Sequence, residues 1–168
     1  MLVIVCGLPA AGKTTLSRRV ARCLGAVLLR IDSIEQAVVR SGVAGHPVGA
    51  VGYVVAHAVA ADQLRQGLSV VAECVNPVAA SRDGWLGLAT DLGVPFAEVE
   101  VICSDEVEHR RRAAERTVDI PDLPLPSWEQ IIGSPYEAWE REHIVIDTAH
   151  RSVEDCVAAV LKEIRLIA

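Results

Sequence analysis

The stretch whose residue types and spacing most plainly suggest chemistry is residues 7–14, GLPAAGKT, where two glycines bracket a loop that ends in lysine and threonine. The apolar run LVIVC precedes this loop, and the helical pattern KTTLSRRVARCL overlaps its end and continues beyond it. Small residues between a strand and a helix let backbone N–H groups point inward at the helix N-terminus, where an anion is favoured. The spacing therefore predicts a cradle for the phosphates of a nucleotide.

Each position of the loop has an expected role. Gly7 and Gly12 would adopt backbone angles that other residues disfavour. Lys13 would reach the β- and γ-phosphates, and the Thr14 hydroxyl would ligate Mg²⁺. ATP and Mg²⁺ are thus the predicted cofactors, and the further loop residues expected to contact the nucleotide are Ala10, Ala11 and Thr15. The alternative, an ordinary glycine-rich turn, is disfavoured by the strand and helix on either side.

A carboxylate follows the second predicted strand. In VLLRIDS the apolar run ends at Asp32, on the same strand face as Arg30 by the period of two. Asp32 could act as the general base for an acceptor hydroxyl, with Arg30 beside the substrate. The alternative is that Asp32 only helps Ser33 to cap the next helix.

The third predicted strand, LSVVAEC, also ends in a carboxylate. Glu73 is a candidate for organising Mg²⁺, although a strand-terminal glutamate that faces water is nearly as plausible. Asn76, in VNP, would lie at the mouth of the sheet and contact substrate.

The segment HRRRAAERT places Arg112 and Arg116 four residues apart, and so on one helical face. Mobile arginines there could stabilise the charge that develops in phosphoryl transfer. A solvated basic face is the alternative, and Arg110 and Arg111 fit it better. Residues 117–126, TVDIPDLPLP, follow directly, and their three prolines predict a semi-rigid flap.

Tyr53 and His57 share a face of a long predicted helix and could line an acceptor pocket, although a buried histidine is more often a core residue. The three tryptophans are expected mostly in core or lid packing. They are Trp85, Trp128 and Trp139.

Composition limits the alternatives. The 168 residues are 51% hydrophobic but only 4% aromatic, which is typical of a Val/Ala/Leu/Ile-rich parallel sheet in one domain, 1–168. With 16 basic and 22 acidic residues the net charge is −6, which disfavours long nucleic acid as a partner. No signal peptide is expected, and the uncharged segment 41–61 is predicted as a buried helix rather than a membrane span, so a cytoplasmic protein is expected. Five scattered cysteines are interpreted as reduced core residues: Cys6, Cys23, Cys74, Cys103 and Cys156.

Strand and helix patterns alternate along the chain. Strands are predicted at 2–6, 26–31, 69–74, 96–103 and 143–147, and helices at 13–24, 33–41, 47–66, 78–92, 105–116 and 152–164. Ser33 with Gln36, and Ser127 with Gln130, have capping-box spacing. The alternation predicts a doubly wound α/β fold with a parallel sheet and ligands at the carboxyl ends of the strands.

Taken in order, these segments resemble the small P-loop kinases: shikimate kinase, gluconate kinase, chloramphenicol phosphotransferase, zeta toxin and polynucleotide kinase. The chain is most similar to bacterial adenylylsulfate-kinase-like proteins, through GLPAAGKTTL, RID, VNP…R (with Arg82), HRRR…R and the terminal IDT at 146–148. Glu73 stands where many relatives carry Asp, and the extended acceptor-binding segments of true adenylylsulfate kinases are not found.

The resemblance implies a three-layer α/β/α fold with strand order 2-3-1-4-5 and a lid at about 110–140. It implies ATP and Mg²⁺, a base at Asp32, lid arginines at Arg112 and Arg116, substrate contacts that include Arg82, and a loop after Thr148 that approaches the adenine. A metabolite or antibiotic kinase is the favoured function. A nucleotide-dependent switch, or a kinase of a nucleic-acid end or sugar nucleotide, stays open, as does the oligomeric state.

Overall fold

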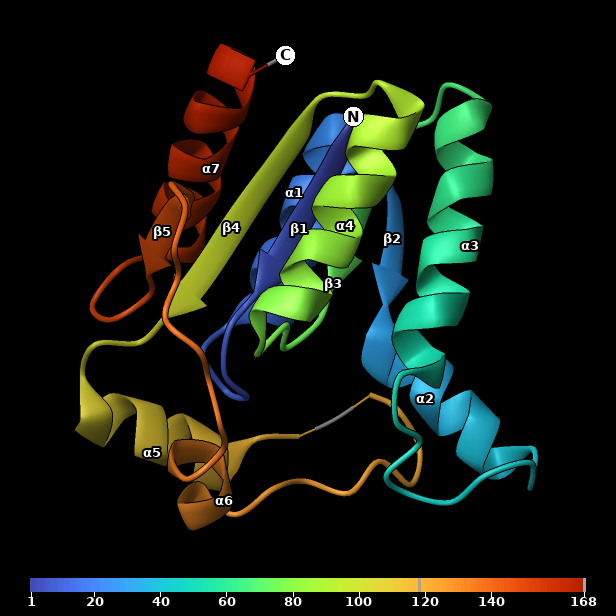
Figure 1. Ribbon diagram of the computed structural model, residues 1–168. Coiled ribbons are helices and arrows are strands. Elements are labelled where there is room, and N and C mark those ends of the chain that lie inside the picture. The colour runs from blue at the N-terminus through green and yellow to red at the C-terminus, as the bar shows by residue number, and fades with distance from the viewer. Residues whose placement is uncertain (118, 168) are drawn as a thin grey trace.

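A parallel five-stranded sheet forms the centre of the computed structural model, which describes residues 1–117 and 119–167. The strand order is β2-β3-β1-β4-β5, and every pairing is parallel (Figure 1). The strands are β1 (Leu2–Cys6), β2 (Val27–Arg30), β3 (Val70–Glu73), β4 (Phe96–Ile102) and β5 (Ile144–Asp147). The predicted fold class and strand order are confirmed.

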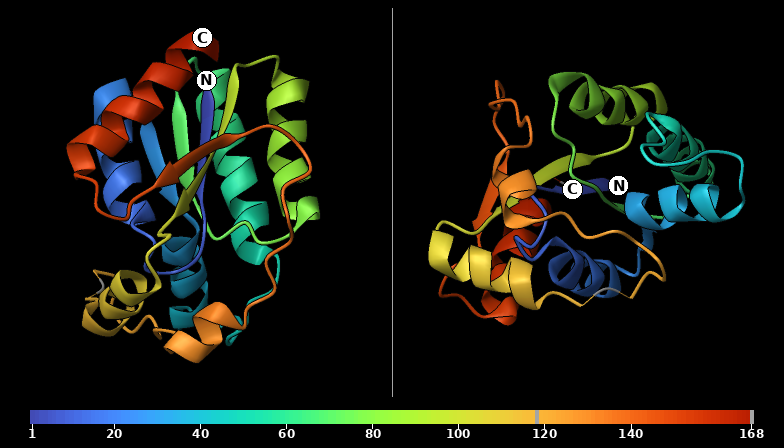
Figure 2. Two further views of the ribbon diagram at one scale, coloured as in Figure 1. Left: turned by 90° about the vertical axis from the view of Figure 1, so that its left-hand side faces the viewer. Right: turned by 90° about the horizontal axis from the view of Figure 1, so that it is seen from below.

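Helices cover both faces of the sheet. In the left panel of Figure 2, α1 and α7 lie on one side of the strands, and α3 and α4 lie on the other. β1 explains why both layers are needed: Val3 and Val5 face one hydrophobic cluster, and Leu2, Ile4 and Cys6 face the other. All five residues are fully buried, as expected for the central strand of a covered parallel sheet. The helices are α1 (Lys13–Leu24), α2 (Ile31–Arg40), α3 (Val51–Arg65), α4 (Ala79–Leu92), α5 (Glu106–Glu115), α6 (Trp128–Ile132) and α7 (Val153–Ile167).

Three helices gather beyond the carboxyl ends of the strands. α2, α5 and α6 lie below the arrowheads in Figure 1, with the connections that join them. Open α/β sheets bind ligands at this end. Among the described residues of the predicted flap 117–126 there is no helix, as its prolines predicted, while position 118 lies outside the described residues.

The helix that follows β2 begins earlier than predicted. α2 starts at Ile31, with Arg30 as its N-cap residue and without a side-chain cap. The predicted capping box at Ser33 and Gln36 is therefore wrong, and Gln36 is instead buried and bonded to His46. The second capping box is confirmed: Ser127 and Gln130 open the short helix α6.

Two expectations about burial need correction. α3 is not a fully buried helix, because it lies at the outside of the molecule and the Val54 side chain is 64% exposed. Cys6, Cys74 and Cys156 are buried as predicted, but Cys23 is exposed on α1. Among the described helices, none has the length and apolar character needed to cross a membrane.

Candidate active site

The loop between β1 and α1 has the backbone geometry that its glycines predicted. Gly7 has a φ of +133°, and a Cβ there would stand 2.1 Å from the carbonyl oxygen of Val101. Gly12 has a φ of +102° and caps α1, whose first turn holds no acidic residue. A concave loop with this open helix N-terminus is suited to an anion, because unpaired N–H groups and the helix dipole act in the same direction.

Lys13 is held inside this loop. Its side chain is buried, and Nζ donates to the carbonyl oxygen of Leu8 at 2.9 Å. Burial lowers the pKa of Lys13, while the negative charges of Glu73 and Asp32 oppose that shift. An ammonium group with a single carbonyl partner can exchange that partner for a phosphate oxygen, which would restore the favourable charge pairing.

Glu73, at the end of β3, connects the loop to β2. It is buried, and its carboxylate accepts hydrogen bonds from the Thr14 hydroxyl, from Ser17 Oγ at 3.2 Å and from Arg30 Nε at 3.2 Å. A hydroxyl and a carboxylate beside a phosphate cradle are the hard oxygen donors that Mg²⁺ prefers. Among the described residues no three His, Cys, Asp or Glu side chains form a metal-binding group.

A cavity of about 450 Å³ lies over the loop, and it is rich in positive charge. Asp119, from the segment after α5, reaches into this wall and pairs with Arg18 and with Arg30 Nη1, the latter at 3.0 Å. Burial acts to raise the pKa of Asp119, but the hydrogen bond from Arg18 and the charge of Arg30 hold that pKa below its ordinary value. The basic residues of the cavity are Lys13, Arg18, Arg30, Arg112 and Arg116.

The two predicted lid arginines have different surroundings. Arg112 is fixed: its Nε donates to Glu108 at 2.8 Å, and its Nη1 donates to the Thr148 hydroxyl at 2.8 Å. Arg116 follows the last turn of α5, lines two cavities and has no ion pair with another described residue. Arg116 is therefore the more mobile of the two candidates for contacting a transferring phosphoryl group.

Thr148, just after β5, joins three parts of the site. Its hydroxyl accepts from Arg112 and lies 2.9 Å from the Ala11 carbonyl oxygen, to which it can donate. A second cavity, of about 200 Å³, adjoins this point, and its wall is made by α1, Arg112 and the start of α7. The lining includes Gly12, Thr15, Leu16, Thr148, Arg151, Val153 and Cys156. The resemblance predicted the adenine at this position, after Thr148.

On the other side of Lys13 lie two adjoining cavities of about 210 and 360 Å³. Both are lined by Asp32, Glu35 and Val75, and we call the two cavities together the recess. Asp32 is in the first turn of α2, not at the end of a strand, so the predicted strand face shared with Arg30 is wrong. The helical turn still directs Asp32 into the recess, and the recess reaches Lys13.

Glu35 was missed in the sequence because a glutamate in mid-helix usually faces water. Its place three residues after Asp32 was the available signal, since that spacing shares a helix face. Burial and the nearby charge of Asp32 raise the pKa of Glu35 to about 7. The folded protein therefore favours the protonated form of Glu35.

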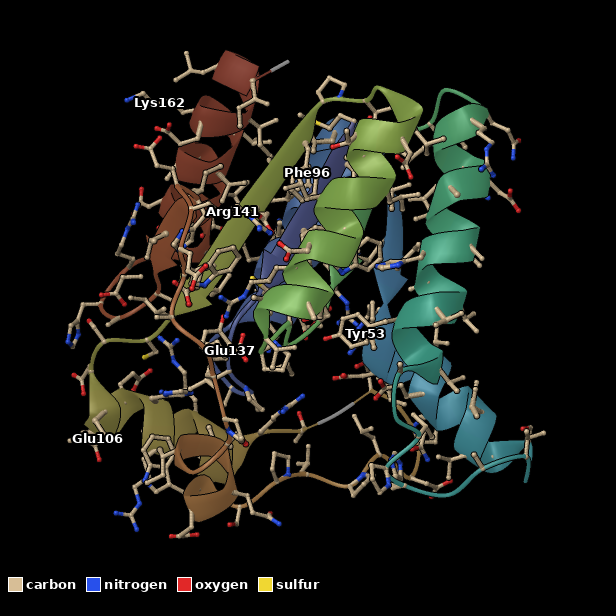
Figure 3. The ribbon with its side chains drawn as sticks, in the orientation of Figure 1. Tyr53, Phe96, Glu106, Glu137, Arg141 and Lys162 are labelled. Carbon is tan, nitrogen blue, oxygen red and sulfur yellow. The ribbon has the colours of Figure 1, made fainter. Side chains whose placement is uncertain are left out.

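The predicted pair Tyr53 and His57 does not act together. Tyr53, labelled in Figure 3, lines the recess. Its hydroxyl accepts from the backbone N–H of Asn76 at 2.9 Å. His57 packs edge-on against Trp85, with ring centroids 4.0 Å apart, and lines none of the described cavities. His57 is therefore placed in core packing, which was the alternative interpretation.

Arg82 and Asn76 lie behind the recess rather than on its surface. Asn76 is fully buried, and Arg82 is only 2% exposed. Arg82 donates to the carbonyl oxygens of Asn76, Glu137 and Ala138, and it packs over the Trp139 ring at 4.1 Å. With its donors used on backbone carbonyls, Arg82 holds the chain after α6 in place and offers nothing to a substrate. Trp85 is likewise core, and Trp128 packs against His109 of α5.

Comparison with solved structures shows the same fold throughout the chain. A sugar kinase from Janibacter sp. HTCC2649 is 20% identical, with a TM-score of 0.70 over 99% of this chain and 95% of that one. A gluconokinase from Sinorhizobium meliloti 1021 is 19% identical, with a TM-score of 0.68 over 98% and 92% of the two chains. The APS kinase of Mycobacterium tuberculosis, in complex with AMPPNP and APS, is 21% identical, with a TM-score of 0.72 over 98% and 96%.

No curated protein matches the chain in sequence. A family model described as an AAA domain, AAA_33, matches residues 2–134, a span that contains the phosphate loop, Asp32, Glu73 and the lid arginines. The chain therefore belongs to this AAA domain family and has the small P-loop kinase fold that its sequence resembles.

Proposed function

We propose that this protein is a kinase that transfers the γ-phosphate of ATP to a hydroxyl group of a small-molecule acceptor, either a metabolite or an antibiotic. The observation that carries the proposal is the placement of Asp32. Its carboxylate lies on the wall of a recess that opens onto Lys13, so a base and a phosphate-binding lysine face the same space. A nucleotide switch has no need of a base at that position.

Each residue has a defined task in this proposal. Backbone N–H groups of residues 7–14 and Lys13 would hold the phosphates, while Thr14 and Glu73 offer oxygen donors for Mg²⁺. ATP supplies the transferable phosphoryl group, and Mg²⁺ neutralises part of its charge. Asp32 accepts the proton of the acceptor hydroxyl as that oxygen bonds to phosphorus, and ADP is the leaving group. Lys13 and Arg116 stabilise the charge on the transferring oxygens.

The test is ADP release over a panel of hydroxyl metabolites and antibiotics, with Lys13→Ala as the blank. With an active acceptor, Asp32→Asn should bind ATP within a few-fold of wild type, while transfer falls about 10²-fold, as expected for a lost general base. The matched control is Asp91→Asn, which removes the same charge from an exposed position on α4. Near-normal transfer by Asp32→Asn would show that Asp32 is not the general base. If no compound in the panel stimulates ADP release, a nucleotide-dependent switch would be favoured instead.

A further inference from the structure

The transfer chemistry proposed above leaves Glu35 without a task. Its side chain lines both cavities of the recess, one helical turn after Asp32. Glu35 therefore faces the acceptor rather than the phosphates. The inference that follows rests on the proposed function, and it concerns the chemical class of the acceptor.

Asp32 and Glu35 differ from the other inward-facing carboxylates of the fold. Glu73 pairs with Arg30, Glu98 pairs with Arg141, and Glu100 pairs with His143. Within residues 1–117 and 119–167, Asp32 and Glu35 have neither an ion pair nor a hydrogen bond through their side chains. The half-buried carboxyl group of Glu35 is costly to ionise without a partner, and its raised pKa reflects this cost. A ligand that donates hydrogen bonds or brings positive charge would remove this cost of ionising Glu35.

Positive charge in the recess is confined to one end. Lys13 and Arg116 stand where the recess meets the phosphate cavity, and both also line that cavity. His46 donates from Nε2 to Gln36 Oε1 at 3.0 Å. The far part of the recess has no basic side chain among its described lining, which besides Asp32 and Glu35 consists of Ile31, Tyr53, Val75, Pro77, Ser134 and Pro135. An acceptor with a carboxylate or phosphate there would add a third negative charge to a largely apolar wall.

The backbone provides room for Glu35. A Cβ at Gly52, in the first turn of α3, would stand 2.5 Å from Glu35 Cγ. The Glu35 side chain therefore lies directly against α3, in a space that exists because residue 52 is glycine. This packing places the carboxyl group at the wall of the recess.

We propose that the acceptor is a hydroxyl compound that also carries an amine, bound with its ammonium group facing Glu35 and its reactive hydroxyl facing Asp32. An ammonium ion donates up to three hydrogen bonds and brings positive charge to the part of the recess whose described lining has no basic side chain. Its arrival favours the ionised form of Glu35, so amine binding releases a proton when Glu35 starts protonated. The recess thus selects against anionic acceptors.

The test compares three open-chain six-carbon probes that differ only at one end: D-glucamine (ammonium), D-sorbitol (hydroxyl) and D-gluconate (carboxylate). Each is titrated into the full chain saturated with Mg²⁺ and a non-hydrolysable ATP analogue, and amide NMR shifts of α2 report binding. D-Glucamine should bind at least about tenfold more tightly than D-gluconate, a difference of about 1.4 kcal/mol, with D-sorbitol between them. Glu35→Gln should remove the advantage of D-glucamine over D-sorbitol. Glu142→Gln, at an exposed position outside the recess, should keep it.

Two results would overturn the inference: D-gluconate binding as tightly as D-glucamine, or an amine preference that survives in Glu35→Gln. Absence of shifts in α2 with all three probes at about 50 mM would also overturn it, since a built amine site should bind in the millimolar range. The titration requires no phosphoryl transfer. Amine-selective binding without ADP release in the panel would therefore contradict the proposed kinase activity, while the recess would still be assigned as an amine-binding site. ADP release with anionic acceptors alone would instead support the kinase activity and contradict the amine-binding assignment of the recess.

Discussion

The two sides of Lys13 are built on opposite principles. On the phosphate side, two of the arginines are already held by partners: Arg30 by Glu73 and Asp119, and Arg112 by Glu108 and Thr148. On the acceptor side, Asp32 and Glu35 have no side-chain partners among the described residues. A site in which charges are already paired keeps its shape before the ligand arrives, whereas unpaired groups await the complementary charge of a ligand. In the proposed function, the fold therefore prepares the nucleotide site in advance, whereas the acceptor itself would supply the missing partners on its side.

The largest expected effect comes from Lys13→Ala, on the prepared side. Turnover should fall by about 10²–10³-fold or more, because a positively charged donor to the developing phosphate charge is lost. The fold should be retained, since Nζ contacts only a loop carbonyl. Steady-state ADP release and thermal unfolding measure the two effects. Equal ADP release by wild type and variant, after contaminating ATPases are removed, would contradict the site assignment.

A smaller effect is expected for Glu73→Gln, which keeps the shape of the side chain but removes its charge. The Mg²⁺ concentration needed for half-maximal activity should rise about 10- to 100-fold, the range seen when the groups around metal ligands are changed. Glu98→Gln is the matched control, because Glu98 is equally buried on β4 and also pairs with an arginine, Arg141. The control variant should be less stable but should need no more Mg²⁺ than wild type. If both variants need the same higher Mg²⁺ concentration, Glu73 is not specific to the metal site.

On the acceptor side, Glu35 makes stability depend on pH. The pKa is raised from 4.5 to about 7, so the folded state favours the protonated form. The free energy of unfolding therefore falls as pH rises from about 4.5 to about 7. The Glu35→Gln variant should not show this fall, because its side chain does not ionise. After allowance for solvent screening of a half-buried group, the variant should be about 1–2 kcal/mol more stable at pH 8 and equal to wild type near pH 4. Denaturant unfolding at both pH values measures this, and parallel pH profiles would contradict it.

The smallest effect concerns the lid. Asp119 ties the segment after α5 to Arg18 and Arg30, yet Asp119 is half exposed, so the pairing should slow opening only a few-fold. We expect faster hydrogen exchange over residues 119–140 in Asp119→Asn and no change in Asp122→Asn. Across 117–140, wild-type protection should be lower than in the sheet and should rise with ATP and acceptor. Identical protection with and without ligands would mean that the lid does not close.

The phosphate loop could be predicted from sequence because its geometry is local. The glycines, the lysine and the flanking strand and helix lie within 24 residues, and the small P-loop kinase resemblance supplied the strand order. The acceptor side could be predicted only in part. Asp32 was predicted as the base and lines the recess, but its role stays a prediction. α2 begins without a side-chain cap, so the sequence carried no local signal for its true start. That boundary error hid the shared helix face of Asp32 and Glu35.

Residues whose surroundings come from distant parts of the chain were the hardest to assign. Arg82 looks like a ligand-binding arginine in sequence, but its partners Glu137, Ala138 and Trp139 lie more than 50 residues away. His57 is similar, because Trp85 determines its place in the core. The three-dimensional environment, not the residue type, separates these two residues from the site.

The buried guanidinium of Arg82 also bears on where this protein can be divided. The matched family region ends at residue 134, immediately before the carbonyl groups of Glu137 and Ala138 that Arg82 binds. A fragment that stopped at 134 would leave a positive charge stranded in the interior and would strip Ile146, Val157 and Val160 from one face of the sheet. We expect such a fragment to fail to fold, and we predict that independent folding requires the chain through α7.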